Sequence, residues 1–264
     1  MDIDPAILAH YAEGLEHDRL TQRLSLELLR TQVLLERFLP PAPAKVLDVG
    51  GASGVYASWL STRGYDVHLV DPVPLHIEQA AAAGGFSVAL GDARHLVEMD
   101  ETYDAVLLLG PLYHLVERAD RLLALREAGR VVRVGGVILA AAISRYASSF
   151  DGFFRGFADE PGFADLIHED LRSGQHRNPG NITERFTTAY FHDRDGLAAE
   201  VVEAGLVLAA VVAIEGPMHW APDIRERLAD PVQRQLVLDV LAVMDDDPAV
   251  AGATAHLLAV AHRA

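Results

Sequence analysis

A glycine-rich turn that directly follows a short apolar run is the strongest chemical signal in this sequence. The segment over residues 46–56 reads VLDVGGASGVY, which predicts a buried strand, a turn and the start of a helix. Gly50, Gly51 and Gly54 remove side chains where a ligand can approach the backbone, and the first amides of the helix have no partner within it. Nucleotides bind at such a crevice of an open α/β sheet, although a plain strand-to-helix connection can contain the same glycines.

Acidic residues mark the ends of the next two predicted strands. Asp71 closes the run VHLVD about 20 residues after the turn, where a carboxylate can accept hydrogen bonds from ribose hydroxyls or cap a helix. Asp92 follows the third predicted strand, where its carboxylate can accept from an adenine amino group. Because the carboxyl ends of parallel strands meet at one edge of a sheet, these groups and the exit of the fourth strand at residues 109–114 predict a nucleoside site.

The elements that position these residues follow from the apolar pattern. Short β-rich runs alternate with helical stretches, which predicts a parallel sheet covered by helices on both faces. Two further runs near the end of the chain predict an antiparallel hairpin that closes the sheet. A helical pattern over residues 18–39 stops at a group of prolines before the first strand. The predicted strands are residues 45–49, 66–70, 86–90, 103–109, 134–143, 206–215 and 255–262, and later helices are expected over 195–204 and 222–244.

The alternation breaks over residues 145–190, a segment that is too long for an ordinary loop in a compact domain. Its aromatic and charged residues predict a helical lid that closes over a substrate, or a small helical cap whose aromatic residues form its own core. The polar run SGQHRNPG over residues 173–180 is hard to explain by packing. The substrate contacts that we expect in this segment and just after it are His176, Arg177, Asn178, Tyr190 and His192.

The glycine turn and the acidic strand ends resemble class I S-adenosylmethionine-dependent methyltransferases, strongly over residues 45–143 and by topology elsewhere. The resemblance implies an α/β, doubly wound, Rossmann-like sheet of seven mostly parallel strands with a terminal antiparallel hairpin. It also implies one domain over residues 1–264, with N-terminal helices over 5–39 and a helical lid inserted after the fifth strand, at about 145–190. S-adenosyl-L-methionine is the cofactor that this resemblance implies.

By the same resemblance, each strand end would bind a different part of the cofactor. Asp48 and the turn from Gly50 to Gly54 would hold the methionine part, although Ala52 stands where the family often has glycine. Asp71 would accept hydrogen bonds from the ribose hydroxyls, and Asp92 and Ala93 would bind the adenine. Tyr11 belongs to a segment that folds over the cofactor in related proteins, or that docks on the sheet as an amphipathic helix. The expected cofactor-binding set is Tyr11, Asp48, Gly50, Gly51, Ala52, Gly54, Asp71, Pro72, Asp92, Ala93 and Leu109, the last through its backbone.

Methyl transfer from a sulfonium is an in-line displacement in which the protein mainly aligns the reactants and excludes water. A hydroxyl or protonated amine acceptor also needs a base, and a neutral histidine suits that role near pH 7. We expect His114 to be this base and Tyr113 to orient the acceptor, because the loop after the fourth strand lies beside the methyl group in this fold. His176 is a further catalytic candidate. Alternatively, Tyr113 and His114 only begin a helix.

Composition narrows the acceptor and the compartment. A formal charge of -16 repels phosphate backbones, so we expect a small-molecule acceptor and no nucleic acid. Cysteine is absent and the 12 histidines form no H-E-x-x-H motif, so we expect no metal. The N-terminus lacks a signal-peptide pattern and no apolar stretch reaches roughly 20 residues, which predicts a cytoplasmic protein without a membrane span.

The predicted activity is therefore methyl transfer to oxygen or nitrogen, rather than carbon, of a small molecule. A composition rich in Ala, Arg, Val and Asp suggests natural-product tailoring, and the oligomeric state is open, with a homodimer among the alternatives. A non-catalytic S-adenosylmethionine-binding protein remains an alternative. A nicotinamide-dependent oxidoreductase is disfavoured, because the turn does not match G-x-G-x-x-G when read from Gly50.

Overall fold

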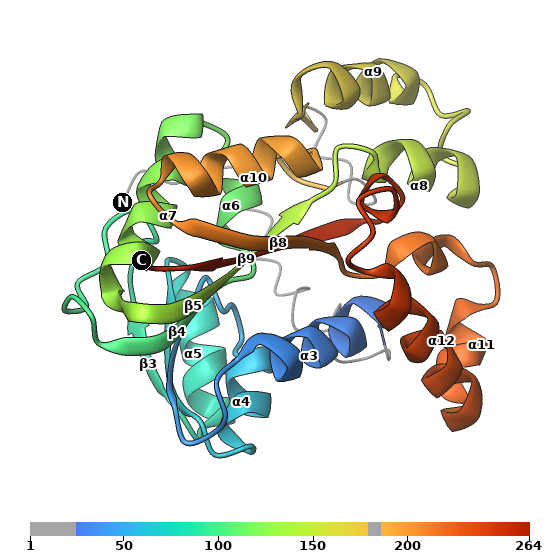
Figure 1. Cartoon of the computed structure of the whole chain (residues 1–264). Helices are drawn as coiled ribbons and strands as arrows, with labels where there is room; N and C mark the ends of the chain where they lie inside the picture. The colour runs from blue at the N-terminus through green and yellow to red at the C-terminus, as the bar shows by residue number, and fades with distance from the viewer. Residues whose placement is uncertain (1–24, 179–185) are drawn as a thin grey trace.

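The computed structural model describes residues 25–178 and 186–264, and a seven-stranded sheet forms its centre. Its strand order is β3-β2-β1-β4-β5-β9-β8 (Figure 1). β9 runs antiparallel to both β5 and β8, whereas the pairs from β3 to β5 are parallel. The strands are β1 (Lys45–Val49), β2 (Asp66–Asp71), β3 (Ser87–Leu90), β4 (Tyr103–Leu108), β5 (Val132–Ile143), β8 (Val207–Ala213) and β9 (His256–His262). This confirms the predicted doubly wound sheet with its terminal antiparallel hairpin.

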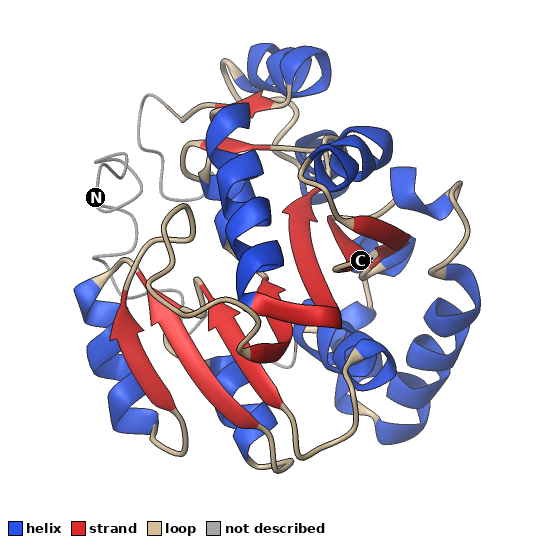
Figure 2. Ribbon diagram, turned by 60° about the vertical axis from the view of Figure 1, so that its left-hand side comes forward, coloured by secondary structure: helices blue, strands red, loops and turns tan. Residues whose placement is uncertain are grey.

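Helices cover both faces of the sheet, as Figure 2 shows. One face packs on α3 (Leu26–Phe38), α4 (Val55–Ser61) and α5 (Pro74–Ala83), and the other on α6 (Pro111–His114), α7 (Arg118–Val131) and α10 (Arg194–Glu203). Successive residues of β4 alternate between the two cores: Ala105 and Leu107 join the first, and Val106 and Leu108 join the second. The sheet is therefore buried on both sides, which explains its continuous apolar runs.

The insertion after β5 contains two helices and a short hairpin. These are α8 (Ala147–Arg155), α9 (Phe163–Ser173), β6 (Gln175–His176) and β7 (Ala189–Tyr190). Phe150 of α8 packs on Trp220 of the 3-10 helix η1 (Gly216–Trp220), with ring centroids 4.6 Å apart. The structure therefore contains a helical insertion at the predicted place, and its role as a lid stays a prediction.

The predicted helix over residues 222–244 is two helices, α11 (Ile224–Ala229) and α12 (Pro231–Met244). The break occurs because the Asp230 carboxylate accepts from the amides of Val232 and Gln233 and so caps α12, with Pro231 at its first position. The short 3-10 helix η2 (Val250–Gly252) then leads into β9. At the other end of the chain, α3 begins after its cap Ser25. The predicted helical segment before it, and Tyr11, lie outside the described residues.

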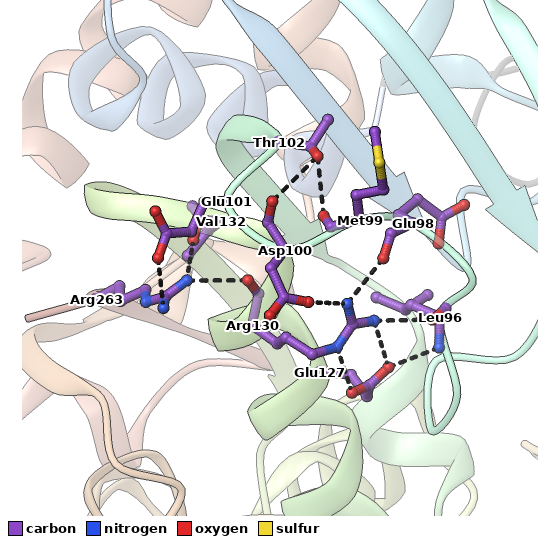
Figure 3. Close-up of polar contacts among 10 residues, drawn as sticks. All are labelled: Leu96, Glu98, Met99, Asp100, Glu101, Thr102, Glu127, Arg130, Val132 and Arg263. Carbon is purple, nitrogen blue, oxygen red and sulfur yellow. Dashed lines mark hydrogen bonds and ion pairs between the residues drawn. The ribbon is translucent and has the colours of Figure 1, made fainter.

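An arginine network secures the loop that runs from β3 back to the start of β4 (Figure 3). Arg130 donates to the carbonyl oxygens of Leu96 and Glu98, each at 2.8 Å, and to the carboxylates of Asp100 and Glu127. Its backbone carbonyl in turn accepts from Arg263, the residue that follows β9. The cofactor candidates Asp92 and Ala93 stand at the start of this loop. The Arg130 network restrains the other end of the loop, which leads into β4 at the opposite edge of the sheet.

Candidate active site

A cavity of about 340 Å³ lies at the carboxyl ends of the parallel strands. In an open α/β sheet this is the edge where ligands bind. Nine of the cofactor residues expected from the sequence line it, namely Asp48, Gly50, Gly51, Ala52, Asp71, Pro72, Asp92, Ala93 and Leu109. The folded chain therefore brings the signals of four separate strand ends to one cavity.

Asp48 is a buried carboxylate in the wall of this cavity. Its exposed fraction is 1%, and neither carboxylate oxygen has a hydrogen-bond partner among the described residues. Burial raises the pKa of Asp48 to about 7, and the nearby charge of Asp71 adds to the effect. A buried carboxylate without a donor is costly, so this position favours a ligand that brings a positive charge or a donor.

The glycine turn leaves no space for side chains. A Cβ atom on Gly51 would lie 2.6 Å from Oδ2 of Asp48, and one on Gly50 would lie 2.8 Å from Cγ of Pro111. Gly54 does not line the cavity among the described residues; it starts α4 with a φ of +83°, which favours glycine. The turn conformation, rather than contact with a ligand, therefore explains why this position is glycine.

The carboxylate of Asp71 ties the end of β2 to the glycine turn. It accepts from the backbone amides of Ala52 and Val73 and from Nδ1 of His76, each at 2.9 Å. These bonds hold its oxygens in the cavity wall. The Val73 amide precedes α5, so Asp71 binds next to the start of this helix without capping its first turn.

Asp92 forms a close pair with Arg94. The carboxylate accepts from the Arg94 backbone amide at 2.9 Å and from its guanidinium at 2.7 Å, and Arg94 also binds Asp120. Burial acts to raise the pKa of Asp92, but the Arg94 side chain outweighs it and holds the pKa below its usual value. Asp92 is therefore ionised and held in place in the cavity wall, just after the carboxyl end of β3.

The opposite end of the cavity lies beyond β5, and sequence reasoning missed it. Its wall includes Glu27 and Thr31 of α3, Ile214 after β8 and His256 at the start of β9. Glu27 and His256, together with buried Glu215, form a group of possible metal ligands in the described part of the chain, with ligand atoms within 4.8 Å of one another. The cavity therefore has one end suited to a nucleoside and another that carries acids and an imidazole.

Comparison with known proteins agrees with this geometry. A methyltransferase domain model matches residues 46–136, which contain the turn and both acidic strand ends. Over these residues the chain is similar to a methyltransferase domain, and its sheet has the class I methyltransferase fold. S-adenosylmethionine is the cofactor of this class. The tightly packed glycine turn is consistent with it, and so is Asp48, whose carboxylate has no partner among the described residues.

The relatives match this chain over part of their length. An uncharacterized methyltransferase of Mycobacterium tuberculosis is 38% identical over 103 residues, which cover 39% of this chain and 41% of the relative. The ubiquinone biosynthesis O-methyltransferase of Methylocella silvestris is 33% identical over 143 residues, or 52% of this chain and 48% of that protein. The chain thus spans less than half of these relatives.

Solved structures share the fold of this chain at low sequence identity. An S-adenosylmethionine-dependent methyltransferase from Mesorhizobium loti has a TM-score of 0.61 at 15% identity, covering 90% of this chain and all of that one. This similarity extends well beyond residues 46–136. At this identity it establishes the fold alone.

Both catalytic candidates after the fourth strand lie in the wall of the cavity. Tyr113 and His114 occupy the short helix α6, with their rings edge to face at 4.6 Å. The Tyr113 hydroxyl donates to the carbonyl of Leu109 at 3.3 Å, and the His114 ring stacks on Phe186 at 5.8 Å. Tyr113 and His114 therefore belong to a helix and also line the cavity, and their catalytic roles stay predictions.

The substrate and catalytic candidates of the insertion differ in whether they line the cavity. Arg177 lines the cavity, whereas His176 and Asn178 do not appear in its described wall. His176 is buried with Nδ1 at 2.9 Å from a carboxylate oxygen of Asp170, and its ring stacks on Phe191. The structure thus gives His176 a packing environment outside the described cavity wall, which does not support the predicted catalytic role.

His192 and Tyr190 also lie away from the described cavity wall. His192 is buried with Nε2 at 3.2 Å from Glu200, and desolvation lowers its pKa despite that carboxylate. The Tyr190 ring lies against the guanidinium of Arg121, 3.6 Å from the ring centroid. Arg121 and Glu200 are themselves joined by a hydrogen bond of 2.7 Å. These residues form a buried polar cluster under α10 rather than the expected substrate contacts.

Proposed function

We propose that this protein transfers a methyl group from S-adenosylmethionine to a hydroxyl oxygen of a small molecule. The observation that carries the proposal is the buried carboxylate of Asp48, which has no partner among the described residues and lies in a cavity that four strand ends line together. When bound, the cofactor supplies an electrophilic methyl group on a positively charged sulfur. The protein then has to hold the cofactor, align an acceptor and receive a proton.

The cavity residues suit the parts of this cofactor. Asp48 would hold the cationic amino group of its methionine part, which compensates the cost of the buried charge. Asp71 would accept from the ribose hydroxyls, because its carboxylate is already held in the wall by the turn amide of Ala52. The loop residues Asp92 and Ala93 would contact the adenine. The backbone carbonyl of Leu109 would accept from the amino group of the methionine part.

A compact acceptor fits the size and charge of the site. A cavity of about 340 Å³ is near the lower limit of small-molecule sites, about 300 Å³. The wall contains Glu27, Glu117 and Asp120, which disfavour a polyanionic acceptor such as nucleic acid. Arg177 brings the insertion to the wall, which supports a role as a lid. The O-methyltransferase among the relatives favours oxygen over nitrogen as the acceptor atom.

The role in natural-product tailoring, the cytoplasmic location and the homodimer stay predictions. Among the described helices, none has the length and apolar character that crossing a bilayer requires. The non-catalytic alternative also stays open to experiment, because a binding site and a catalytic site share the same cofactor residues.

The test uses a pair of glycine variants of the full chain. Gly51→Ala places a methyl group 2.6 Å from Oδ2 of Asp48, whereas Gly252→Ala enters open space in η2. We expect calorimetry to show S-adenosylhomocysteine binding by the wild type and Gly252→Ala but not by Gly51→Ala, with similar circular dichroism for all three. Absence of binding by the wild type would refute the proposal.

Activity is then measured as S-adenosylhomocysteine release from S-adenosylmethionine with a panel of small hydroxylated and amine compounds. Release with hydroxylated compounds supports the proposal, and release only with amines would move the acceptor atom to nitrogen. Binding without release from any member of a broad panel would favour the non-catalytic alternative.

A further inference from the structure

The end of the cavity beyond β5 is the place where an acceptor would meet the proposed donor. His256 is the first residue of β9 and pairs with Ile143, the last residue of β5. Because β9 is antiparallel, its first residue lies at the same edge as the carboxyl ends of the parallel strands. The adenosine-side residues occupy the ends of β2 and β3, so the cofactor would extend across β1 and β4 towards this end.

Glu215 holds the ring of His256 in place. Oε1 of Glu215 lies 2.5 Å from Nδ1 of His256, and Oε2 accepts from the His256 backbone amide at 3.0 Å. Oε2 also lies 3.2 Å from the hydroxyl of Thr254. The Glu215 side chain is fully buried, whereas 18% of the His256 side chain is exposed and forms part of the cavity wall. The carboxylate is therefore hidden behind the imidazole.

The charge state of Glu215 follows from these contacts. Oε2 of Glu215 accepts from the His256 backbone amide, a bond that favours the ionised carboxylate. An ionised carboxylate can only accept hydrogen bonds, so Nδ1 of His256 must carry the proton between them. In the neutral ring the lone pair then belongs to Nε2.

We propose that His256 is the general base for the acceptor hydroxyl and that Glu215 is its positioning residue. This inference rests on the proposed methyl transfer. In the step, the hydroxyl proton passes to Nε2 of His256 while the oxygen forms a bond to the methyl carbon. The electron pair of the broken carbon–sulfur bond stays on the sulfur, which becomes neutral. The positive charge thus passes to the imidazolium, beside the carboxylate of Glu215.

The charged neighbours of the pair suit this transfer. A carboxylate oxygen of Glu27, on α3, lies within 4.8 Å of the ligand atoms of both residues. His219, on η1, has Nδ1 at 3.8 Å from Oε1 of Glu215, and burial lowers its pKa. Arg155, on α8, contacts His219 on its other nitrogen at 2.6 Å. Two carboxylates close to one imidazole would stabilise the positive charge that the ring gains in the reaction.

A divalent cation is the competing reading of the same three residues, because their ligand atoms lie close enough together to hold one. The hydrogen bond between Nδ1 and Oε1 argues for the proton. A metal on Nδ1 would need the lone pair that the donated proton occupies, and it would break the closest contact of the buried carboxylate. The two readings therefore predict different states of one nitrogen atom.

Nuclear magnetic resonance of ¹⁵N-histidine-labelled full chain, with S-adenosylhomocysteine bound, tests the proposal without an acceptor. The missing signal in His256→Asn assigns the residue, and His262→Asn, at the other end of β9, is the matched control. We expect the neutral ring of His256 to carry its proton on Nδ1, and Glu215→Gln to change that tautomer balance. A ring protonated on Nε2 in the wild type, or stoichiometric Mn²⁺ that selectively broadens the His256 signal, would overturn the proposal.

The second measurement uses whichever hydroxyl compound supports turnover. We expect His256→Asn to lower kcat by roughly 10²- to 10⁴-fold, the usual contribution of a general base, with the Kd for S-adenosylhomocysteine within about twofold of the wild type. His114→Asn is measured beside it. Full turnover by His256→Asn would overturn the proposal and leave His114 as the base. Loss of cofactor binding in the wild type would instead refute the proposed function, so the two failures are distinct.

Discussion

Asp48 allows a test in which stability and cofactor binding change in opposite directions. Its pKa is about 7 in the folded chain and 3.8 ordinarily, so the native state holds the proton more tightly than the unfolded state. The free energy of unfolding therefore falls as pH rises from about 4 to 7 and is lowest above the folded pKa. At about 1.36 kcal/mol per pH unit, the ionised carboxylate costs the ligand-free protein roughly 4 kcal/mol at pH 8.

Asp48→Asn removes this charge but still buries an amide without a partner, which costs about 1–3 kcal/mol. We therefore expect the variant to be more stable than the wild type at pH 8 by roughly 1–3 kcal/mol, or several degrees in Tm. We also expect it to lose most of the decline in stability between pH 4 and 7. Asp239→Asn, at an exposed position of α12, is the control and should keep the wild-type profile.

Cofactor binding by the same variant should weaken. The amino group of S-adenosylhomocysteine would pair with ionised Asp48, so the Kd of the wild type should rise up to about tenfold per pH unit as pH falls below 7. Asp48→Asn should bind more weakly at pH 8 and lack this pH dependence. Calorimetric binding and thermal unfolding across pH 4–8 measure both effects. Equal stability and equal affinity of variant and wild type at pH 8 would refute the reasoning.

Three further substitutions test the cofactor site and the scaffold. Asp71→Asn should weaken S-adenosylhomocysteine binding roughly 10- to 100-fold, as expected for the loss of charged hydrogen bonds, and calorimetry that shows unchanged affinity would contradict the ribose assignment. Arg121→Met removes the guanidinium that pairs with buried Glu200 and should lower the free energy of unfolding by about 3–5 kcal/mol. Urea denaturation measures this change, and an unchanged midpoint of unfolding would contradict the role of this ion pair. Arg130→Ala removes the bonds in Figure 3 and should cost about 2 kcal/mol without changing cofactor affinity, and an equal Tm would contradict that role.

The central strands were predictable because they lie in the buried middle of the sheet. β1 has the predicted bounds, and β2 and β4 differ from theirs by one residue at one end, since their apolar runs are bounded by polar and glycine residues. The helices were harder to delimit. The predicted helix over 222–244 contains a stop at Asp230 that depends on a side-chain cap, which periodicity does not reveal.

The cofactor half of the site was predictable for a related reason. Each of its residues follows a strand directly, so Asp71 and Asp92 reach the same edge whenever the strands are parallel. The other half was not, because Glu27, Glu215 and His256 are far apart in sequence and meet only through the antiparallel insertion of β9. A usable signal was present: Glu215 and His256 both stand at the ends of predicted strands.

Histidine composition alone was a poor guide. His176 and His192 were chosen because polar residues in an inserted segment are often functional. Both are instead buried against carboxylates, with Nδ1 or Nε2 within about 3 Å of Asp170 or Glu200. Such a pair resembles the pair of His256 and Glu215 in chemistry, and the difference is access. Only His256 of these three histidines belongs to the described cavity wall.

Two buried carboxylates of this cavity region differ in pKa because they differ in partners. Asp48 has no donor among the described residues, and its pKa is raised to about 7. Glu215 is equally buried but receives an imidazole and a backbone amide, and its pKa is lowered. A carboxylate of the first kind gains most from a ligand that brings a cation, and one of the second kind can stabilise a charge that arises during the reaction. The two ends of the cavity thus match a donor that arrives charged and an acceptor that must lose a proton.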